Sequence, residues 1–82
     1  NVVLPGTIET PGWKHRVEAR PDVFEKVKSW YPVGRVGRPE DIAAAVAFLS
    51  ADEAGFVNGA SLAVDGGLTA GSFKMIKDMI GK

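Results

Sequence analysis

Val2-Val3-Leu4-Pro5-Gly6, near the beginning of this 82-residue chain, is an apolar run that ends at a proline and a glycine. β-Branched residues favour extended backbone, whereas proline lacks a backbone donor and glycine permits unusual backbone angles. We therefore predict the end of a buried strand over residues 1–4. A second short run, Ser61-Leu62-Ala63-Val64, is closed by Asp65-Gly66-Gly67 and predicts a second buried strand.

Helical patterns fill the sequence between these runs, so we expect the two strands to be parallel and joined by a helical crossover. The clearest helix is predicted from Pro39 to about Leu49, because proline and two acidic residues suit a first turn. A shorter helix is predicted from Pro21 to about Ser29 by its apolar spacing. Thr10 before Pro11 has the pattern of a helix N-cap.

Further helical signals follow in the second half of the chain. Ser50 with Glu53 matches a capping box and predicts a short extra turn. Residues 72–80 predict an amphipathic helix, with an apolar side formed by Phe73, Ile76, Met79 and Ile80. Two strands with connecting helices indicate an α/β fold, but an isolated strand pair is not an independent sheet. We therefore expect the chain to be a fragment of a larger domain.

The composition argues against several classes of protein. Ten basic and ten acidic side chains balance, without a basic run that would favour nucleic acid. The longest uncharged apolar stretch, Ile42–Leu49, is far shorter than the roughly 20 residues that span a bilayer. Cysteine is absent and His15 is the single histidine, so we expect no metal site. No nucleic-acid or membrane partner is expected, and a cytoplasmic location fits this composition.

Several blocks of sequence, taken in order, resemble the C-terminal end of classical short-chain dehydrogenases/reductases over residues 1 to about 68. Their order and spacing carry the signal, since any one block is weak evidence. Similar endings occur in 3-oxoacyl carrier-protein reductases and glucose dehydrogenase-like members. The resemblance implies the C-terminal part of a doubly wound, parallel Rossmann-type sheet. The blocks are NVVLPGTIET at 1–10, GRVGRPEDIA at 34–43, FLS at 48–50, NG at 58–59 and VDGG at 64–67.

The resemblance also implies where an NAD or NADP cofactor lies. Pro5 and Gly6 would end a strand beside the nicotinamide, Ile8 would meet the carboxamide through its backbone, and the Thr10 hydroxyl would bond the cofactor. Ligands of open α/β sheets bind outside the carboxyl ends of the strands, which is where residues 5–10 would lie. Without the resemblance, Pro5-Gly6 is an ordinary turn and Thr10 only an N-cap.

Residues 11–33 correspond to the variable segment that covers the substrate in this family. Trp13 and Trp30 are the candidates for a lid over an alcohol or ketone. The alternative is that these aromatic rings pack short helices onto the sheet; it stays open for Trp13 and is favoured for Trp30. Tyr31 and Arg35 imitate the spacing of the family's catalytic tyrosine and lysine, but arginine cannot replace that lysine. No catalytic residue is therefore expected in this chain.

The predicted parent is an NAD(P)-dependent oxidoreductase that moves hydride between nicotinamide and an alcohol or carbonyl carbon. The chain itself lacks the glycine-rich phosphate loop and the catalytic pair, so we expect it to be inactive alone. Within a single domain, residues 39–67 would supply a helix and the last strand, and residues 68–82 a tail. The resemblance implies a homo-oligomer formed through Pro39–Leu49 and Ser61–Val64. The alternative function is a non-enzymatic oligomerisation or binding module derived from this fold.

Overall fold

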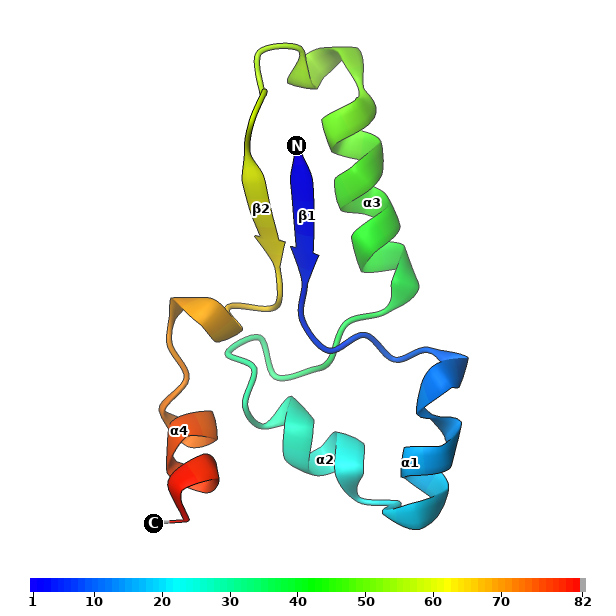
Figure 1. Ribbon diagram of the computed structural model, residues 1–82, viewed down its shortest axis with the longest axis vertical. Helices are drawn as coiled ribbons and strands as arrows, with labels where there is room; N and C mark the ends of the chain where they lie inside the picture. The colour runs from blue at the N-terminus through cyan, green and yellow to red at the C-terminus, as the bar shows by residue number, and fades with distance from the viewer. Residues whose placement is uncertain (82) are drawn as a thin grey trace.

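The computed structural model describes residues 1–81, and its sheet consists of two parallel strands. Strand β1 (Val2–Pro5) pairs with β2 (Ser61–Val64), and both arrows point the same way in Figure 1. The register places Val3 opposite Leu62 and Leu4 opposite Ala63. The predicted parallel pairing and the α/β class are confirmed.

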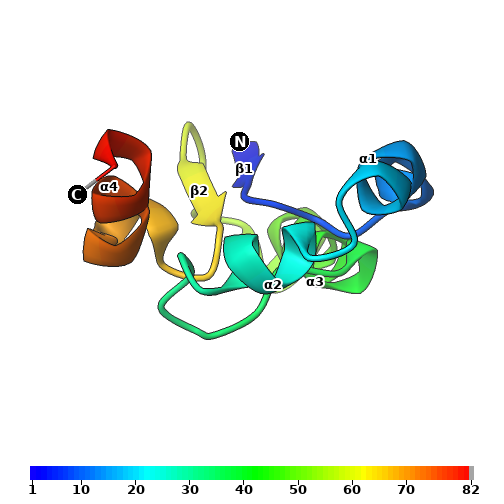
Figure 2. The same cartoon turned by 90° about the horizontal axis from the view of Figure 1, so that it is seen from below.

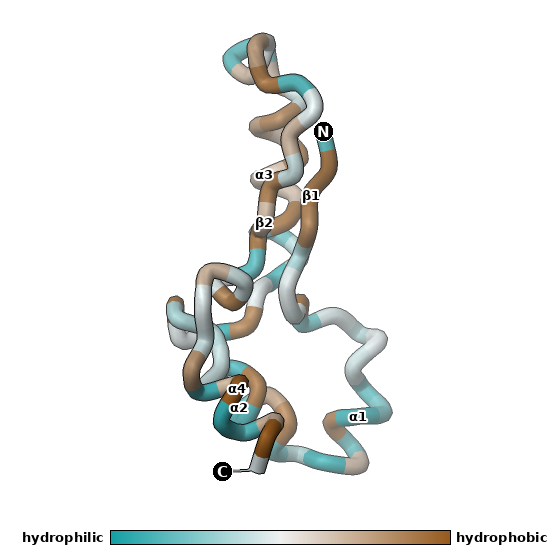
Figure 3. Tube along the Cα trace, turned by 60° about the vertical axis from the view of Figure 1, so that its left-hand side comes forward, coloured by the Kyte–Doolittle hydropathy of each residue, from teal (hydrophilic) through white to brown (hydrophobic). Residues whose placement is uncertain are grey.

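Helix α3 (Pro39–Ser50) covers one face of this strand pair and leaves the other face open, as Figures 1 and 2 show. Successive side chains of a strand point to opposite faces. Val3 is accordingly half-buried, whereas Val2 and Leu4 are 52% and 49% exposed. The hydrophobic run of β1 is visible in Figure 3. The prediction of a buried strand is therefore wrong on this face, because no element within residues 1–81 covers it.

Helix α3 has the start that its sequence predicts. Proline occupies the first turn, and the Asp41 carboxylate accepts a hydrogen bond from the Arg38 N–H at 2.8 Å. The helix continues through Ser50, and a 3-10 turn follows over Asp52–Ala54. The predicted capping box of Ser50 is wrong: Ala51 precedes the turn because Ser50 still belongs to α3.

The segment between β1 and α3 forms a 3-10 turn (Pro11–Trp13) and two short helices, α1 (Lys14–Ala19) and α2 (Val23–Lys28). The rings of Trp13 and Phe24 lie 5.1 Å apart and join these helices. Helix α2 begins after Pro21, two residues later than its apolar pattern suggests. Thr10 occupies the predicted N-cap position, but its hydroxyl makes no capping bond.

Helix α4 (Phe73–Ile80) confirms the amphipathic helix predicted near the end of the chain. Its N-cap, Ser72, is 8% exposed and accepts a hydrogen bond from the Met75 N–H at 3.3 Å. The apolar stripe lies in solvent, since Phe73 is 92% exposed and Met79 72%. Among residues 1–81 no helix has the length and apolar character needed to cross a bilayer.

Candidate functional site

The site is built around the loop Gly6–Glu9, which leaves the carboxyl end of β1. Its backbone is held by β2 and by the connection between α2 and α3. The Gly6 N–H donates to the Val64 carbonyl at 3.1 Å, the Thr7 N–H to the Tyr31 hydroxyl at 2.7 Å, and the Glu9 N–H to the Gly37 carbonyl at 2.9 Å. Ile8 is the exception among these N–H groups: within the described chain its N–H has no hydrogen-bond partner, and its carbonyl, like those of Gly6 and Glu9, has none either.

The exception at Ile8 has a geometric cause. Ile8 and Gly37 form an isolated parallel bridge, in which Gly37 bonds the residues before and after Ile8. The Gly37 N–H donates to the Thr7 carbonyl at 2.8 Å, and its carbonyl accepts from Glu9. Because peptide groups alternate in direction along an extended chain, those of Ile8 face away from Gly37. One donor and one acceptor are thus presented side by side by a fixed backbone.

Gly37 also fits the loop through its missing side chain. A Cβ atom at this position would lie 2.5 Å from Ile8 Cδ1, so the isoleucine side chain occupies that space. The side chain of Ile8 is consequently held by packing against Gly37, and its backbone by the hydrogen bonds of Thr7 and Glu9 to Gly37. Since both effects restrict the same residue, the orientation of its free peptide groups is set before any ligand arrives.

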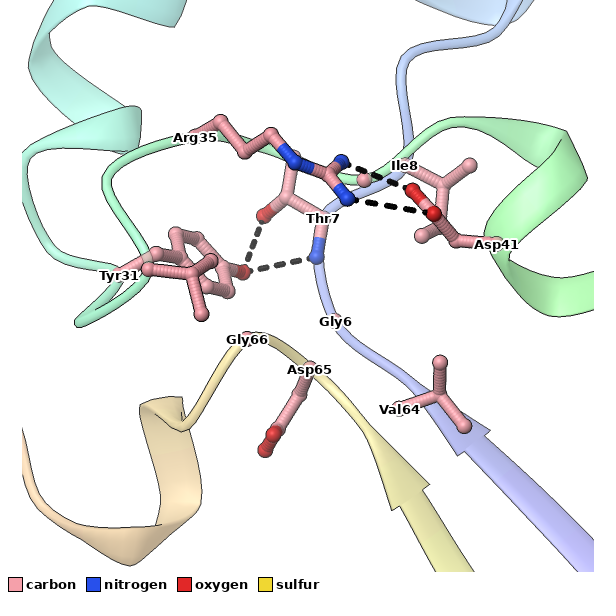
Figure 4. A pocket seen from close by; sticks show the side chains of 11 residues that line it. Gly6, Thr7, Ile8, Tyr31, Arg35, Asp41, Val64, Asp65 and Gly66 are labelled. Atoms are coloured by element: carbon pink, nitrogen blue, oxygen red, sulfur yellow. Dashed lines mark hydrogen bonds and ion pairs between the residues drawn. The ribbon is translucent and has the colours of Figure 1, made fainter. Parts of the chain in front are cut away.

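Tyr31 provides the anchor on the other side of the loop. Its hydroxyl donates to Thr7 Oγ1 at 2.6 Å and accepts from the Thr7 N–H, as the dashed lines of Figure 4 show. The side chain is 6% exposed, which makes it one of the few buried residues of this chain. The sequence indicated Tyr31 as an imitation of a catalytic tyrosine and as part of a possible apolar wall in the substrate-covering segment. No spacing signal indicated its bond to Thr7, because the two residues are 24 positions apart.

An ion pair fixes the turn that carries Gly37. The Arg35 guanidinium contacts both carboxylate oxygens of Asp41, at 2.8 and 3.2 Å. These bonds, together with the Arg38 N–H, lower the pKa of Asp41 from its usual value to about 2. The same hydrogen bond raises the pKa of Arg35. Both groups are therefore charged over the physiological range of pH.

A cavity of about 230 Å³ lies where these loops meet the ends of the strands (Figure 4). That volume is below the usual range of whole-ligand pockets, so the cavity suits only part of a ligand. Gly6 and Ile8 line it, while Pro5 does not. The other lining residues are Thr7, Tyr31, Val33, Arg35, Gly37, Asp41, Val64, Asp65 and Gly66.

The remaining predicted site residues lie in two other places. Thr10 and Trp13 line an apolar groove beside α1, and the Thr10 hydroxyl makes no hydrogen bond within residues 1–81. Trp30 lies in a separate groove next to α4, where its indole N–H donates to Asp78 at 2.8 Å. The structure thus groups Gly6 with Ile8 and Thr10 with Trp13, and it separates Trp30 from both. No group of three metal-ligating side chains occurs in the described chain.

Comparison with known proteins gives consistent findings. The family model described as Enoyl-(Acyl carrier protein) reductase matches residues 1–69. An uncharacterized oxidoreductase of Schizosaccharomyces pombe is 51% identical over 79 residues, which are 96% of this chain and 31% of that protein. The chain therefore spans about a third of this relative.

Two solved structures resemble this arrangement. An oxidoreductase of the short chain dehydrogenase/reductase family from Burkholderia thailandensis has a TM-score of 0.87 and 48% identity, and the match covers 100% of this chain and 32% of that one. A putative 2-deoxy-d-gluconate 3-dehydrogenase from Agrobacterium tumefaciens, solved with bound NADP, has a TM-score of 0.72 and 40% identity. That match covers 84% of this chain and 28% of the other.

Proposed function

This chain belongs to the short-chain dehydrogenase/reductase family, and on that basis we propose that it is the C-terminal part of an NAD(P)-dependent oxidoreductase. The complete enzyme transfers hydride between the nicotinamide and an alcohol or carbonyl carbon, and the cofactor supplies that chemistry. The structural neighbour with bound NADP supports the choice of cofactor class. A cytoplasmic location belongs to the same proposal.

One observation carries the proposal: in a loop whose other N–H groups are hydrogen-bonded, the Ile8 N–H is left without a partner in the described chain, next to an Ile8 carbonyl that also has none. A nicotinamide carboxamide has a carbonyl oxygen that accepts and an NH2 group that donates hydrogen bonds. These groups complement the N–H and carbonyl of a single residue. The loop follows the carboxyl end of β1, where ligands of open α/β sheets bind. The residues present therefore fit the cofactor.

The neighbouring residues have separate roles in this proposal. The Thr10 hydroxyl bonds the cofactor, which is consistent with its lack of any capping bond. Pro5 and Gly6 shape the turn: a Cβ on Gly6 would lie 3.0 Å from both Asp65 and Tyr31, so a larger residue there would force these neighbours to shift. In this proposal Pro5 and Gly6 are part of the cofactor-binding loop and place Ile8 at the nicotinamide.

The substrate-covering segment is residues 11–33, with Trp13 as the lid residue. Trp13 is half-buried in an apolar groove, and the Arg16 guanidinium lies 4.8 Å from its ring centroid. Trp30 was the other lid candidate. Its indole N–H bond to Asp78 supports the packing role instead.

We propose that the chain alone is inactive. The Tyr31 hydroxyl donates its proton to Thr7, and the glycine-rich phosphate loop would belong to another part of the complete protein. Residues 39–67 would contribute a helix and the last strand to one domain, with residues 68–82 as its tail. Pro39–Leu49 and Ser61–Val64 are proposed to contact a second copy. Exposed apolar side chains on both segments support this contact, namely Val46, Phe48 and Leu62.

Amide NMR of the complete protein tests this function. Titration with NADPH or NADH should shift the Ile8 amide resonance strongly and that of Gly37, which already has a partner, much less. Calorimetry in parallel gives the dissociation constant. A folded complete protein that binds neither cofactor but still self-associates would favour the alternative, a non-enzymatic oligomerisation module.

A further inference from the structure

Tyr31 occupies the point where three loops converge, and its hydroxyl is bonded twice to the same residue. It donates to Thr7 Oγ1 at 2.6 Å and accepts from the Thr7 N–H at 2.7 Å. The ring is wedged between the ends of the two strands: a Cβ on Gly6 would lie 3.0 Å from Tyr31 Cε1, and one on Gly66 would lie 3.3 Å from Cδ1. Close packing therefore leaves the phenol little freedom to turn away from Thr7.

Thr7 is in turn the residue that fixes the peptide plane before Ile8. Its N–H and hydroxyl are held by Tyr31, and its carbonyl accepts from the Gly37 N–H at 2.8 Å. The carbonyl of Thr7 and the N–H of Ile8 belong to one planar peptide unit. Anchoring Thr7 at three atoms thus sets the direction in which the Ile8 N–H points.

We propose that Tyr31 is a positioning residue for the cofactor: through Thr7 it holds the Ile8 N–H in the orientation that meets the carboxamide. This inference rests on the proposed function. Tyr31 does not act as a proton donor to a substrate in this arrangement, because its single hydroxyl proton is donated to Thr7. Its effect reaches the ligand only through the loop.

The first experiment substitutes Tyr31→Phe in the complete protein and measures cofactor binding by calorimetry. The change removes both hydrogen bonds between the Tyr31 hydroxyl and Thr7. If the Ile8 N–H then loses its orienting support, the dissociation constant should rise by about 2- to 12-fold, which is the worth of one hydrogen bond from that N–H to the cofactor. The KM for the cofactor should rise by a similar factor, while kcat at saturating cofactor changes less. Thr69→Val is the matched control, since it removes an equally short hydroxyl bond, from Thr69 to Asp65 at 2.6 Å, without touching Thr7.

A second pair of variants separates positioning from mere stability. Thr7→Val removes the hydroxyl that Tyr31 bonds and should weaken cofactor binding, whereas Thr7→Ser keeps it and should bind as the parent does. The double variant Thr7→Val/Tyr31→Phe should bind the cofactor no more weakly than Tyr31→Phe alone. Tyr31→Phe already removes the bond between the two hydroxyl groups that Thr7→Val removes. If Tyr31→Phe fails to fold, the two Thr7 variants still test the positioning role. Equal cofactor affinities of Thr7→Val and Thr7→Ser would overturn the inference.

Amide exchange without cofactor distinguishes this inference from the proposed function. Tyr31→Phe should lose protection at the Thr7 amide, even if the complete protein proves to bind no nicotinamide. Absence of cofactor binding by the unaltered protein would count against the proposed function, and with it against a cofactor role for Tyr31. Unchanged Thr7 protection and unchanged binding in a folded Tyr31→Phe protein would overturn the positioning role alone.

Discussion

Arg35 and Asp41 face each other across the turn before α3, with two guanidinium nitrogens on two carboxylate oxygens at 2.8 and 3.2 Å. The Arg35 side chain is 52% exposed, so solvent screens the attraction and the pair adds little to stability. Its effect is geometric. The turn it closes carries Gly37, which bonds both Thr7 and Glu9 in the loop around Ile8.

Titration of the folded protein should show that the Asp41 carboxyl has a pKa well below its ordinary value. Hydrogen bonds from Arg35 and from the Arg38 N–H bring that pKa to about 2 from the ordinary 3.8. A lowered pKa in the folded state means that the stabilising effect is present above pH 3.8 and is lost as the pH falls through about 2. Carboxyl ¹³C NMR of the folded protein measures the midpoint. Arg35→Gln should move it up, and a midpoint already at 3.8 in the unaltered protein would contradict the pairing.

Gly6→Ala should lower the melting temperature. Its Cβ would meet the Asp65 backbone and the Tyr31 ring, each at 3.0 Å, and neither can move freely. Overpacking of this kind costs roughly 1–3 kcal/mol. Gly12→Ala is the control, because a Cβ there meets only Thr10 Oγ1 at 3.6 Å, an ordinary contact. Equal melting temperatures for the two variants would show that the strand ends are not closely packed at Gly6.

Thr10→Val in the complete protein should weaken cofactor binding without changing stability. The hydroxyl makes no capping bond, so its loss leaves the fold intact. A hydrogen bond to the cofactor is worth about 0.5–1.5 kcal/mol net. Calorimetric titration with cofactor and a thermal melt measure the two effects, with Thr10→Ser as the conservative control. A drop in melting temperature with unchanged binding would assign Thr10 to the helix start.

Ser72→Ala should loosen α4. Its buried hydroxyl accepts from the Met75 N–H and donates to the Trp30 carbonyl at 2.5 Å, so the change removes the helix cap and its link to the turn that follows α2. Loss of an N-cap alone costs about 0.5–2 kcal/mol. Amide exchange over residues 73–80 should speed up. Ser29→Ala, at an exposed serine bonded only to the Lys26 carbonyl, should leave that exchange unchanged.

The elements that sequence predicts well are those decided by local pattern. Both strands and α3 lie within two residues of their expected bounds, because proline, glycine and apolar spacing act over a few positions. The exposed face of β1 could not be foreseen from its apolar run, since such a run does not indicate which elements lie against each face. The role of Ser50 was missed because α3 extends one residue further than expected.

In the candidate site, too, the residues indicated by sequence differ from those that only the structure reveals. A resemblance indicated Ile8, and the bridge to Gly37 supplies the physical reason why its peptide groups are available. The anchors were not predictable, because they join distant positions: Thr7 with Tyr31 across 24 residues and Trp30 with Asp78 across 48. No periodic pattern reports contacts at such separations.

The parallel pairing of β1 with β2 has a consequence for the order of folding. The Asn1 side chain accepts from the Ala60 N–H, 59 positions away, and its amide donates to the Val57 carbonyl. Closing so long a loop lowers the entropy of the chain before the contact that offsets this loss has formed. Folding rates therefore fall as contacts become less local. Helix α3 needs only contacts within one turn, so we expect it to form early. Strand β1 is synthesised first but pairs late. Until β2 has been synthesised, the backbone N–H and carbonyl groups of β1 have no strand to pair with in this segment.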